Sequence, residues 1–192
     1  MISPEVHVML SPTRAYAAYA PAHTRSGLWI ALRRPLFVTL LLGVTIAMSA
    51  THTVAAPVVV SVTICWSAAV LIQLVTGLIV VGPSSRRAVP LSRAVDLFFL
   101  GHAPWSLWLL VVAGMATWMP ELVNTLTVVL TMLVPAALTT RIVAAFSEVV
   151  LGTSRRAAVA RASLHHTVTW IAIIVLFAAA VALWPRVLAV IG

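Results

Sequence analysis

Five long apolar runs, separated by short connections, organise this chain. Hydrocarbon offers no water to peptide N–H and C=O groups, so an apolar run of this length crosses a membrane as a helix. A crossing takes about 20 residues at about 1.5 Å each, and four runs reach that length without their flanks. We therefore predict an all-α fold, a polytopic bundle of five transmembrane helices. The predicted spans are residues 35–54, 57–81, 97–118, 122–140 and 164–184.

The arginines predict how these spans are oriented. All 12 basic residues are arginines, and only Arg186, after the last run, lies on the far side of the predicted spans. Basic residues near span ends are retained in the cytoplasm, which predicts a cytoplasmic N-terminus and an external C-terminus. An odd number of spans requires the same arrangement. Exclusive use of arginine is typical of GC-rich bacterial genomes, so we expect the bacterial cytoplasmic (inner) membrane.

Composition agrees with a membrane protein and leaves little room for a soluble domain. The chain is 62% hydrophobic and 8% charged, against about 25% charged in typical soluble domains. The net charge of +8 is distributed as a topology signal, which suits anionic lipids at the cytoplasmic leaflet and not nucleic acid. Cys65 is the single cysteine and lies inside the second run, so one chain offers no disulfide.

The chain divides into two regions. Residues 1–33 form a polar, proline-punctuated cytoplasmic tail, which we expect to be irregular or ordered by a partner. Residues 34–192 form the five-helix transmembrane domain, with Pro35 and Pro57 at the first helical positions of their runs. The pair Arg33-Arg34 before an apolar run is similar to a twin-arginine export signal, but it begins too deep in the chain. We interpret it as the anchor of an uncleaved first span.

Candidate chemistry is sparse, and we do not expect an enzyme. The chain has four acidic residues, and none is near another in sequence, whereas acid–base and metal chemistry need convergent groups. Asp96 follows Arg93 by three residues, so a helix places both on one face. We expect an ion pair at the membrane interface there, with a docking contact for a partner as the alternative.

His102 is the most informative intramembrane residue. It lies inside the third run beside Gly101, and Pro104 cannot donate to the carbonyl of Leu100, so we expect a kink. The histidine either bonds a freed carbonyl or a neighbouring helix, or has a proton or cofactor role. His165 and His166 are adjacent, so they point about 100° apart on a helix, and we expect them at the interface. A metal or haem edge would require the third and fifth spans to pack together.

Other polar residues within the spans indicate helix packing. Gln73 is expected to hydrogen-bond across helices, and Gly43, Gly77 and Gly114 allow helices to approach closely. We expect no cofactor and no metal. The candidate functional residues inside the membrane are His102, Pro104 and Gln73. The candidates for docking a protein partner or a lipid are Arg33, Arg34, Arg86, Arg87, Arg93, Asp96, Arg155 and Arg156.

Two segments, together with the five runs and their hairpin spacing, resemble the Yip1 family of five-span membrane proteins in its bacterial form. One is Leu91-Ser92-Arg93-Ala94 leading to Gly101-His102-Ala103-Pro104-Trp105, where His102 stands in place of an aromatic residue. The other is Gly152-Thr153-Ser154-Arg155-Arg156-Ala157 before the last run. The resemblance covers about residues 28–190 and implies a cytoplasmic N-terminus and a non-enzymatic protein that binds other membrane proteins. It supplies no catalytic residues.

These observations favour an accessory or scaffolding subunit that docks onto a larger membrane protein complex. Its partners would be other membrane protein subunits and anionic lipids, with residues 1–33 as a clamp for the protein partner. A small membrane component of a transporter or exporter is the alternative. A third possibility is an electron-transfer subunit with a bound cofactor, whose axial ligands would come from His102, His165 or His166.

Overall fold

The structure of the chain, a computed structural model, describes residues 3–21, 27–51, 54–81 and 89–191. These residues are predominantly helical and include no strand, which confirms the all-α prediction. The elements are α1 (Pro4–Leu10), α2 (Pro12–Tyr19), α3 (Leu28–Thr51), α4 (Ala56–Val81), α5 (Leu91–Leu100), α6 (Ala103–Trp118), the 3-10 turn η1 (Pro120–Leu122), α7 (Thr125–Val149) and α8 (Arg155–Ile191).

The long helices account for the predicted membrane spans. Helices α3, α4, α7 and α8 are each long and apolar enough to cross a membrane. Helices α5 and α6 pass the same test together, although they are bent by 40° at a short break. The chain is therefore a multi-pass membrane protein, and its described residues contain four candidate spans, or five if the bent pair crosses as a unit. The orientation of the spans stays a prediction from the arginines.

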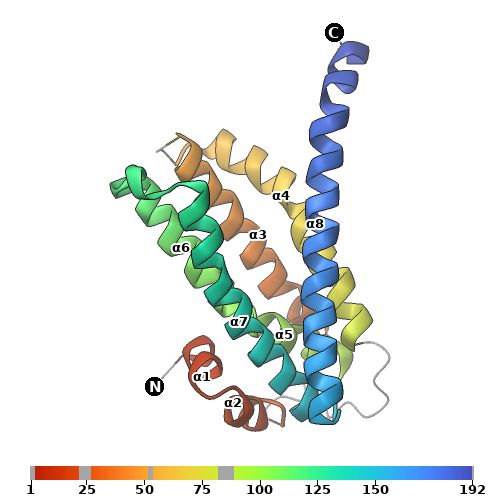
Figure 1. Ribbon diagram of the computed structural model, residues 1–192. Coiled ribbons are helices and arrows are strands. Elements are labelled where there is room, and N and C mark those ends of the chain that lie inside the picture. The colour runs from red at the N-terminus through yellow and green to blue at the C-terminus, as the bar shows by residue number, and fades with distance from the viewer. Residues whose placement is uncertain (1–2, 22–26, 52–53, 82–88, 192) are drawn as a thin grey trace.

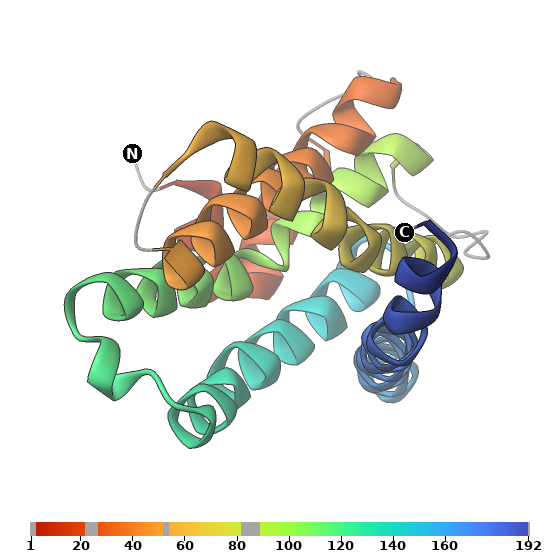
Figure 2. The same ribbon diagram turned by 90° about the horizontal axis from the view of Figure 1, so that it is seen from above.

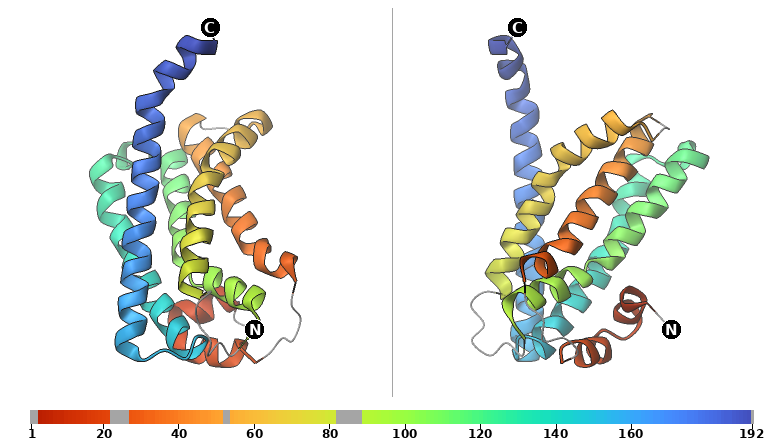
Figure 3. Two further views of the ribbon diagram at one scale, coloured as in Figure 1. Left: turned by 90° about the vertical axis from the view of Figure 1, so that its right-hand side faces the viewer. Right: turned by 180° about the vertical axis from the view of Figure 1, so that it is seen from behind.

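The spans form two antiparallel hairpins joined by the bent pair. Helices α3 and α4 make one hairpin, and α7 and α8 make the other (Figure 1). Helices α5 and α6 pack along α3, and α6 also reaches α7. Seen along the bundle, α8 and α6 lie at opposite edges (Figure 2). Helix α8 continues well beyond the ends of the other helices (Figure 3).

The tightly packed core lies at the arginine-rich end of the bundle. Its largest fully buried side chains include Tyr16, Phe98 and Phe146, with Tyr16 and Phe98 each packed edge-on against Phe146. Away from this end the spans turn many apolar side chains outward. Such exposure is expected of a membrane bundle, because lipid tails solvate apolar surface as well as protein does.

The helix boundaries differ from the ends of three predicted spans. Helix α3 begins at Leu28, and Pro35 lies inside it instead of opening it, since one missing donor kinks a helix without ending it. Helix α7 continues to Val149, nine residues past the predicted end at 140. The charge of Arg141 lowers the hydropathy there, but the side chains that follow it are buried in the core. Helix α8 likewise begins at Arg155 and not at residue 164.

The N-terminal segment is helical, which corrects the expectation of an irregular tail. Ser3 caps α1 by accepting from the N–H of Val6, and prolines occupy the first helical positions of α1 and α2. Val8 and Tyr16 are fully buried, and α2 packs against α7. Each helix has only about two turns, which is too short to show a hydrophobic period in the sequence. Tertiary packing therefore orders this segment.

Candidate functional site

Asp96, on α5, is the centre of a buried ionic cluster. Its side chain is fully buried and accepts hydrogen bonds from three guanidinium groups. Arg33 donates from Nε and Nη2 to the two carboxylate oxygens, at 2.8 and 2.7 Å. Arg34 donates from Nε to Oδ1 at 2.9 Å, and Arg93 donates from Nη1 to Oδ2. We call these four residues together with Glu5 the arginine–aspartate cluster.

The same cluster fastens the N-terminal helices to the bundle. Arg34 donates from Nη1 to Oε1 of Glu5 on α1, at 2.7 Å. Arg93 donates from Nη2 to the backbone carbonyl of Tyr19 at the end of α2, at 3.2 Å. One carboxylate on α5 therefore organises residues from α1, α2, α3 and α5. A buried carboxylate with several charge-assisted hydrogen bonds holds its neighbours in a defined geometry.

Two groups outside the spans have shifted pKa values. Burial alone would raise the pKa of Glu5, but the hydrogen bond and the charge of Arg34 outweigh it, and the pKa is lowered. Burial raises the pKa of the Tyr16 hydroxyl, which donates to the carbonyl of Leu97 at 3.2 Å. Both groups therefore keep one protonation state near neutral pH, and both link the N-terminal helices to the spans.

The structure divides the candidate docking residues into two classes. The predicted pair of Arg93 and Asp96 is confirmed, and Arg33 and Arg34 also bind Asp96, which the sequence did not indicate. Their charges are thus engaged within the chain. Arg155 and Arg156 are exposed at the start of α8. The remaining candidates, Arg86 and Arg87, lie outside the described residues.

A second cluster contains the three histidines His102, His165 and His166. The ring centroid of His102 lies 5.8 Å from that of His165 and 6.4 Å from that of His166. Phe98 contacts both His102 and His165, with centroid distances of 4.9 Å. His165 is buried within the bundle, whereas we expected it at the membrane interface. The third and fifth predicted spans therefore meet at these rings.

Hydrogen bonds fix how two of these imidazoles are protonated. Nδ1 of His102 lies 3.1 Å from the carbonyl of Phe98, and Nδ1 of His166 lies 3.0 Å from the carbonyl of Ala162. A carbonyl only accepts, so each Nδ1 is the donor in its hydrogen bond. Nε2 of His166 is buried without a hydrogen-bond partner. Within the described part of the chain, no group of three His, Cys, Asp or Glu side chains is arranged to hold a metal ion.

The other intramembrane candidates have structural positions. Gly101 and His102 form the predicted break between α5 and α6, and Pro104 is buried in the first turn of α6. Gln73 does not make the expected bond through its side-chain oxygen, which is buried without a partner. The sequence did not predict that Glu5 and Tyr16 contact the long helices of the bundle. The position of Glu5 as the only acidic residue of the tail was the available signal.

Comparisons with known proteins find no relative of this chain. Neither protein-family models, nor curated proteins, nor solved structures match it.

Proposed function

We propose that this chain is a non-catalytic subunit of a membrane protein complex, which binds the transmembrane helices of another protein. The observation that carries the proposal is the exposed surface that α8 presents after its contact with α4. Helix α8 packs on α7 and α4, and Phe177 contacts Trp66 of α4 at a centroid distance of 4.4 Å. Beyond this contact α8 runs on past the other helices (Figure 3).

The surface of α8 is suited to packing against another helix. Ala178, Ala179 and Ala180 follow Phe177 and are exposed. Small side chains let two helix backbones approach closely within a membrane, where association depends on van der Waals packing. Lipid covers large apolar side chains such as Ile174 equally well, so the alanines are the feature that favours a protein partner.

The other observations support the same class of function. The arginine–aspartate cluster uses its charges within the chain, and residues 3–21 pack on the bundle, so we place the docking surface on α8 and not on the N-terminal tail. The resemblance to the Yip1 family also implies a protein that binds membrane proteins. We assign the arginine-rich end to the cytoplasm and the chain to the bacterial cytoplasmic membrane by the positive-inside rule.

Site-specific photo-crosslinking in native cells tests the proposal. A photoreactive residue at Ala179 should give a discrete protein adduct that mass spectrometry can identify. The matched control is Leu133 on α7, which is 58% exposed and should give no such adduct. Lipid adducts alone at both positions would contradict the proposal. An absorption spectrum of the purified complex with a chromophore would favour the electron-transfer alternative, and proteoliposome flux lost on His102→Ala would favour transport.

A further inference from the structure

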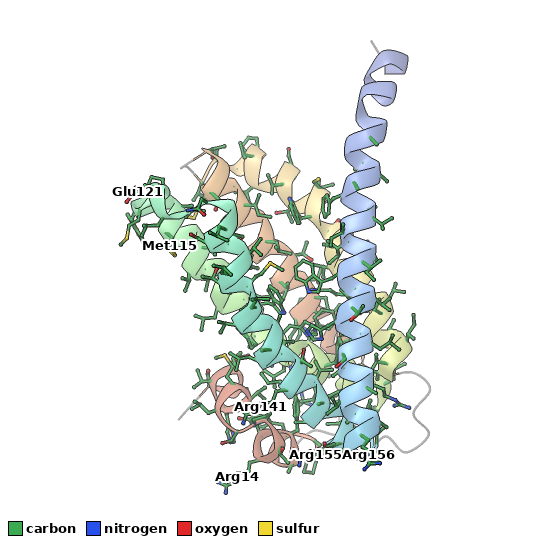
Figure 4. All side chains as sticks on the ribbon, viewed as in Figure 1. Arg14, Met115, Glu121, Arg141, Arg155 and Arg156 are labelled. Carbon is green, nitrogen blue, oxygen red and sulfur yellow. The ribbon has the colours of Figure 1, made fainter. Side chains whose placement is uncertain are left out.

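A cavity of about 620 Å³ opens at the arginine-rich end of the bundle. It lies between the first turn of α2, the last turns of α7 and the first turns of α8. Its charged lining consists of Arg14, Arg141, Arg155 and Glu148. Figure 4 shows the three arginines at this end, and Glu121 at the opposite end of the bundle. We call it the basic cavity.

The turn between α7 and α8 builds this arrangement. Gly152 has a φ of 66°, a left-handed conformation that glycine adopts without strain. Thr153 then bonds the carbonyl of Ser147 through both its N–H, at 3.1 Å, and its hydroxyl, at 2.8 Å. The reversed chain places Arg155 on the same cavity as Arg141 and Glu148, which a single straight helix would keep apart.

The arginines of the basic cavity differ from those of the arginine–aspartate cluster. In the described part of the chain, the side chains of Arg14, Arg141 and Arg155 make no ion pair and no hydrogen bond. Glu148 makes no ion pair either, so the lining carries three positive charges against one negative charge. The first-turn N–H groups of α2 add partial positive charge, because its N-cap residue Ser11 makes no side-chain capping bond.

The position and the walls of the cavity indicate an amphipathic anion. Arg155 is the first residue of one candidate span, and Arg141 lies about two turns before the end of another. Ala137, Ala144 and Val159 line the cavity as well, and Ala137 lies one turn deeper along α7 than Arg141. A phosphate at the arginines would thus leave its glycerol and first methylene groups against apolar side chains. Basic pockets between transmembrane helices bind anionic headgroups in this way.

We propose that the basic cavity binds the phosphate group of an anionic phospholipid, through Arg14, Arg141 and Arg155. Arginine suits this role because its planar guanidinium forms paired hydrogen bonds to phosphate oxygens. Glu148 opposes the anion and weakens its binding. This site is independent of the docking surface proposed for α8, because the basic cavity lies beside the first turns of α8 and the docking surface lies near its other end.

The test is a titration of the purified chain in a neutral detergent. Short-chain phosphatidylglycerol should raise the thermal midpoint in a saturable manner, and native mass spectrometry should show bound lipid. Short-chain phosphatidylcholine and inorganic phosphate are the other two arms, and each should give little stabilisation. A shift with inorganic phosphate equal to that with phosphatidylglycerol would identify a soluble anion and overturn the lipid assignment. Equal shifts with both lipids would overturn the anion site.

Variants locate the binding in the cavity. Arg141→Gln and Arg155→Gln should each weaken the apparent affinity about fivefold, at the strength typical of one basic residue near an anionic surface. Arg156→Gln is the matched control, because Arg156 neighbours Arg155 but does not line the cavity, and it should change the affinity less than twofold. Glu148→Gln should strengthen binding. Equal losses in Arg155→Gln and Arg156→Gln would show nonspecific surface attraction and overturn the proposal.

Discussion

Arg33 and Asp96 lie 63 positions apart in the chain, yet their side chains form a two-pronged ion pair, with N–O distances of 2.8 and 2.7 Å. The carboxylate is fully buried, whereas the arginine side chain is 43% exposed. The pair therefore joins α3 to α5 at the edge of the packed core. The planar guanidinium matches the planar carboxylate in a way that the compact charge of a lysine cannot.

Asp96→Asn should destabilise the protein strongly. The change leaves three guanidinium groups close together with no carboxylate among them. Breaking a buried ion pair from one side typically lowers the free energy of unfolding by about 3–5 kcal/mol, and we expect the lower end because Arg33 is partly exposed. The thermal midpoint in detergent measures the loss. Faster tryptic cleavage after Arg14 should accompany it, since α1 and α2 lose their attachment.

Glu5→Gln is the matched control for that variant. The Glu5 side chain is 42% exposed, so its pair with Arg34 is worth no more than about 1 kcal/mol. A stability loss as large as that of Asp96→Asn would mean that the cluster is not centred on Asp96. Unchanged stability in both variants would contradict the attachment role of the cluster.

Gly77→Leu should also destabilise the bundle, through overpacking. A Cβ atom at position 77 would lie 2.6 Å from Cε1 of Phe98, which is closer than any real contact. Because Phe98 is fixed between Phe146 and His102, it cannot move away freely. We expect a loss of about 1–3 kcal/mol, measured as a lower thermal midpoint. Gly27→Ala is the control, since a Cβ there meets no atom within 4 Å and should leave the midpoint unchanged.

The sequence alone predicted those features of the structure that depend on residues close together in the chain. Pro104 predicted a kink in the third span, where the structure has the break between α5 and α6. The three-residue spacing of Arg93 and Asp96 predicted their pairing. Gly77 was expected to allow a close approach, and it does so against Phe98. In each case the contact is set by helix geometry or by the absence of a side chain, which the sequence displays directly.

Long-range contacts could not be predicted in the same way. The arginine–aspartate cluster forms because α1, α3 and α5 pack together. The sequence offers many arginines as possible partners for few carboxylates, so it does not show which of them pair. His165 lies at the start of the predicted last span, a position from which a side chain can face the interface or the bundle. Packing against Phe98 places it in the bundle. The basic cavity depends on the chain reversal at Gly152, which brings Arg155 to the last turns of α7.

A hydrogen bond between Thr76 and Thr169 should couple α4 to α8 measurably. Their hydroxyl oxygens lie 2.8 Å apart and both side chains are buried. Polar pairs between membrane helices contribute about 0.6 kcal/mol on average and up to about 1.7 kcal/mol. A double-mutant cycle with Thr76→Val and Thr169→Val should give a coupling energy in this range. Strictly additive losses would show that the bond contributes nothing to stability.

Acid should weaken the attachment of α1 through Glu5. The Glu5 pKa is lowered from its ordinary value of 4.5 in the folded chain, so the unfolded chain binds more protons as the pH falls through this region. The stabilisation by Glu5 is therefore fully present above pH 4.5 and is lost as the pH drops through the lower, folded-state pKa. Comparing thermal midpoints of the wild type and Glu5→Gln across this window isolates the effect, since other carboxyls titrate in both proteins. The two curves should converge at the acid end, and a constant difference between them would show that the Glu5 carboxylate is not held by Arg34.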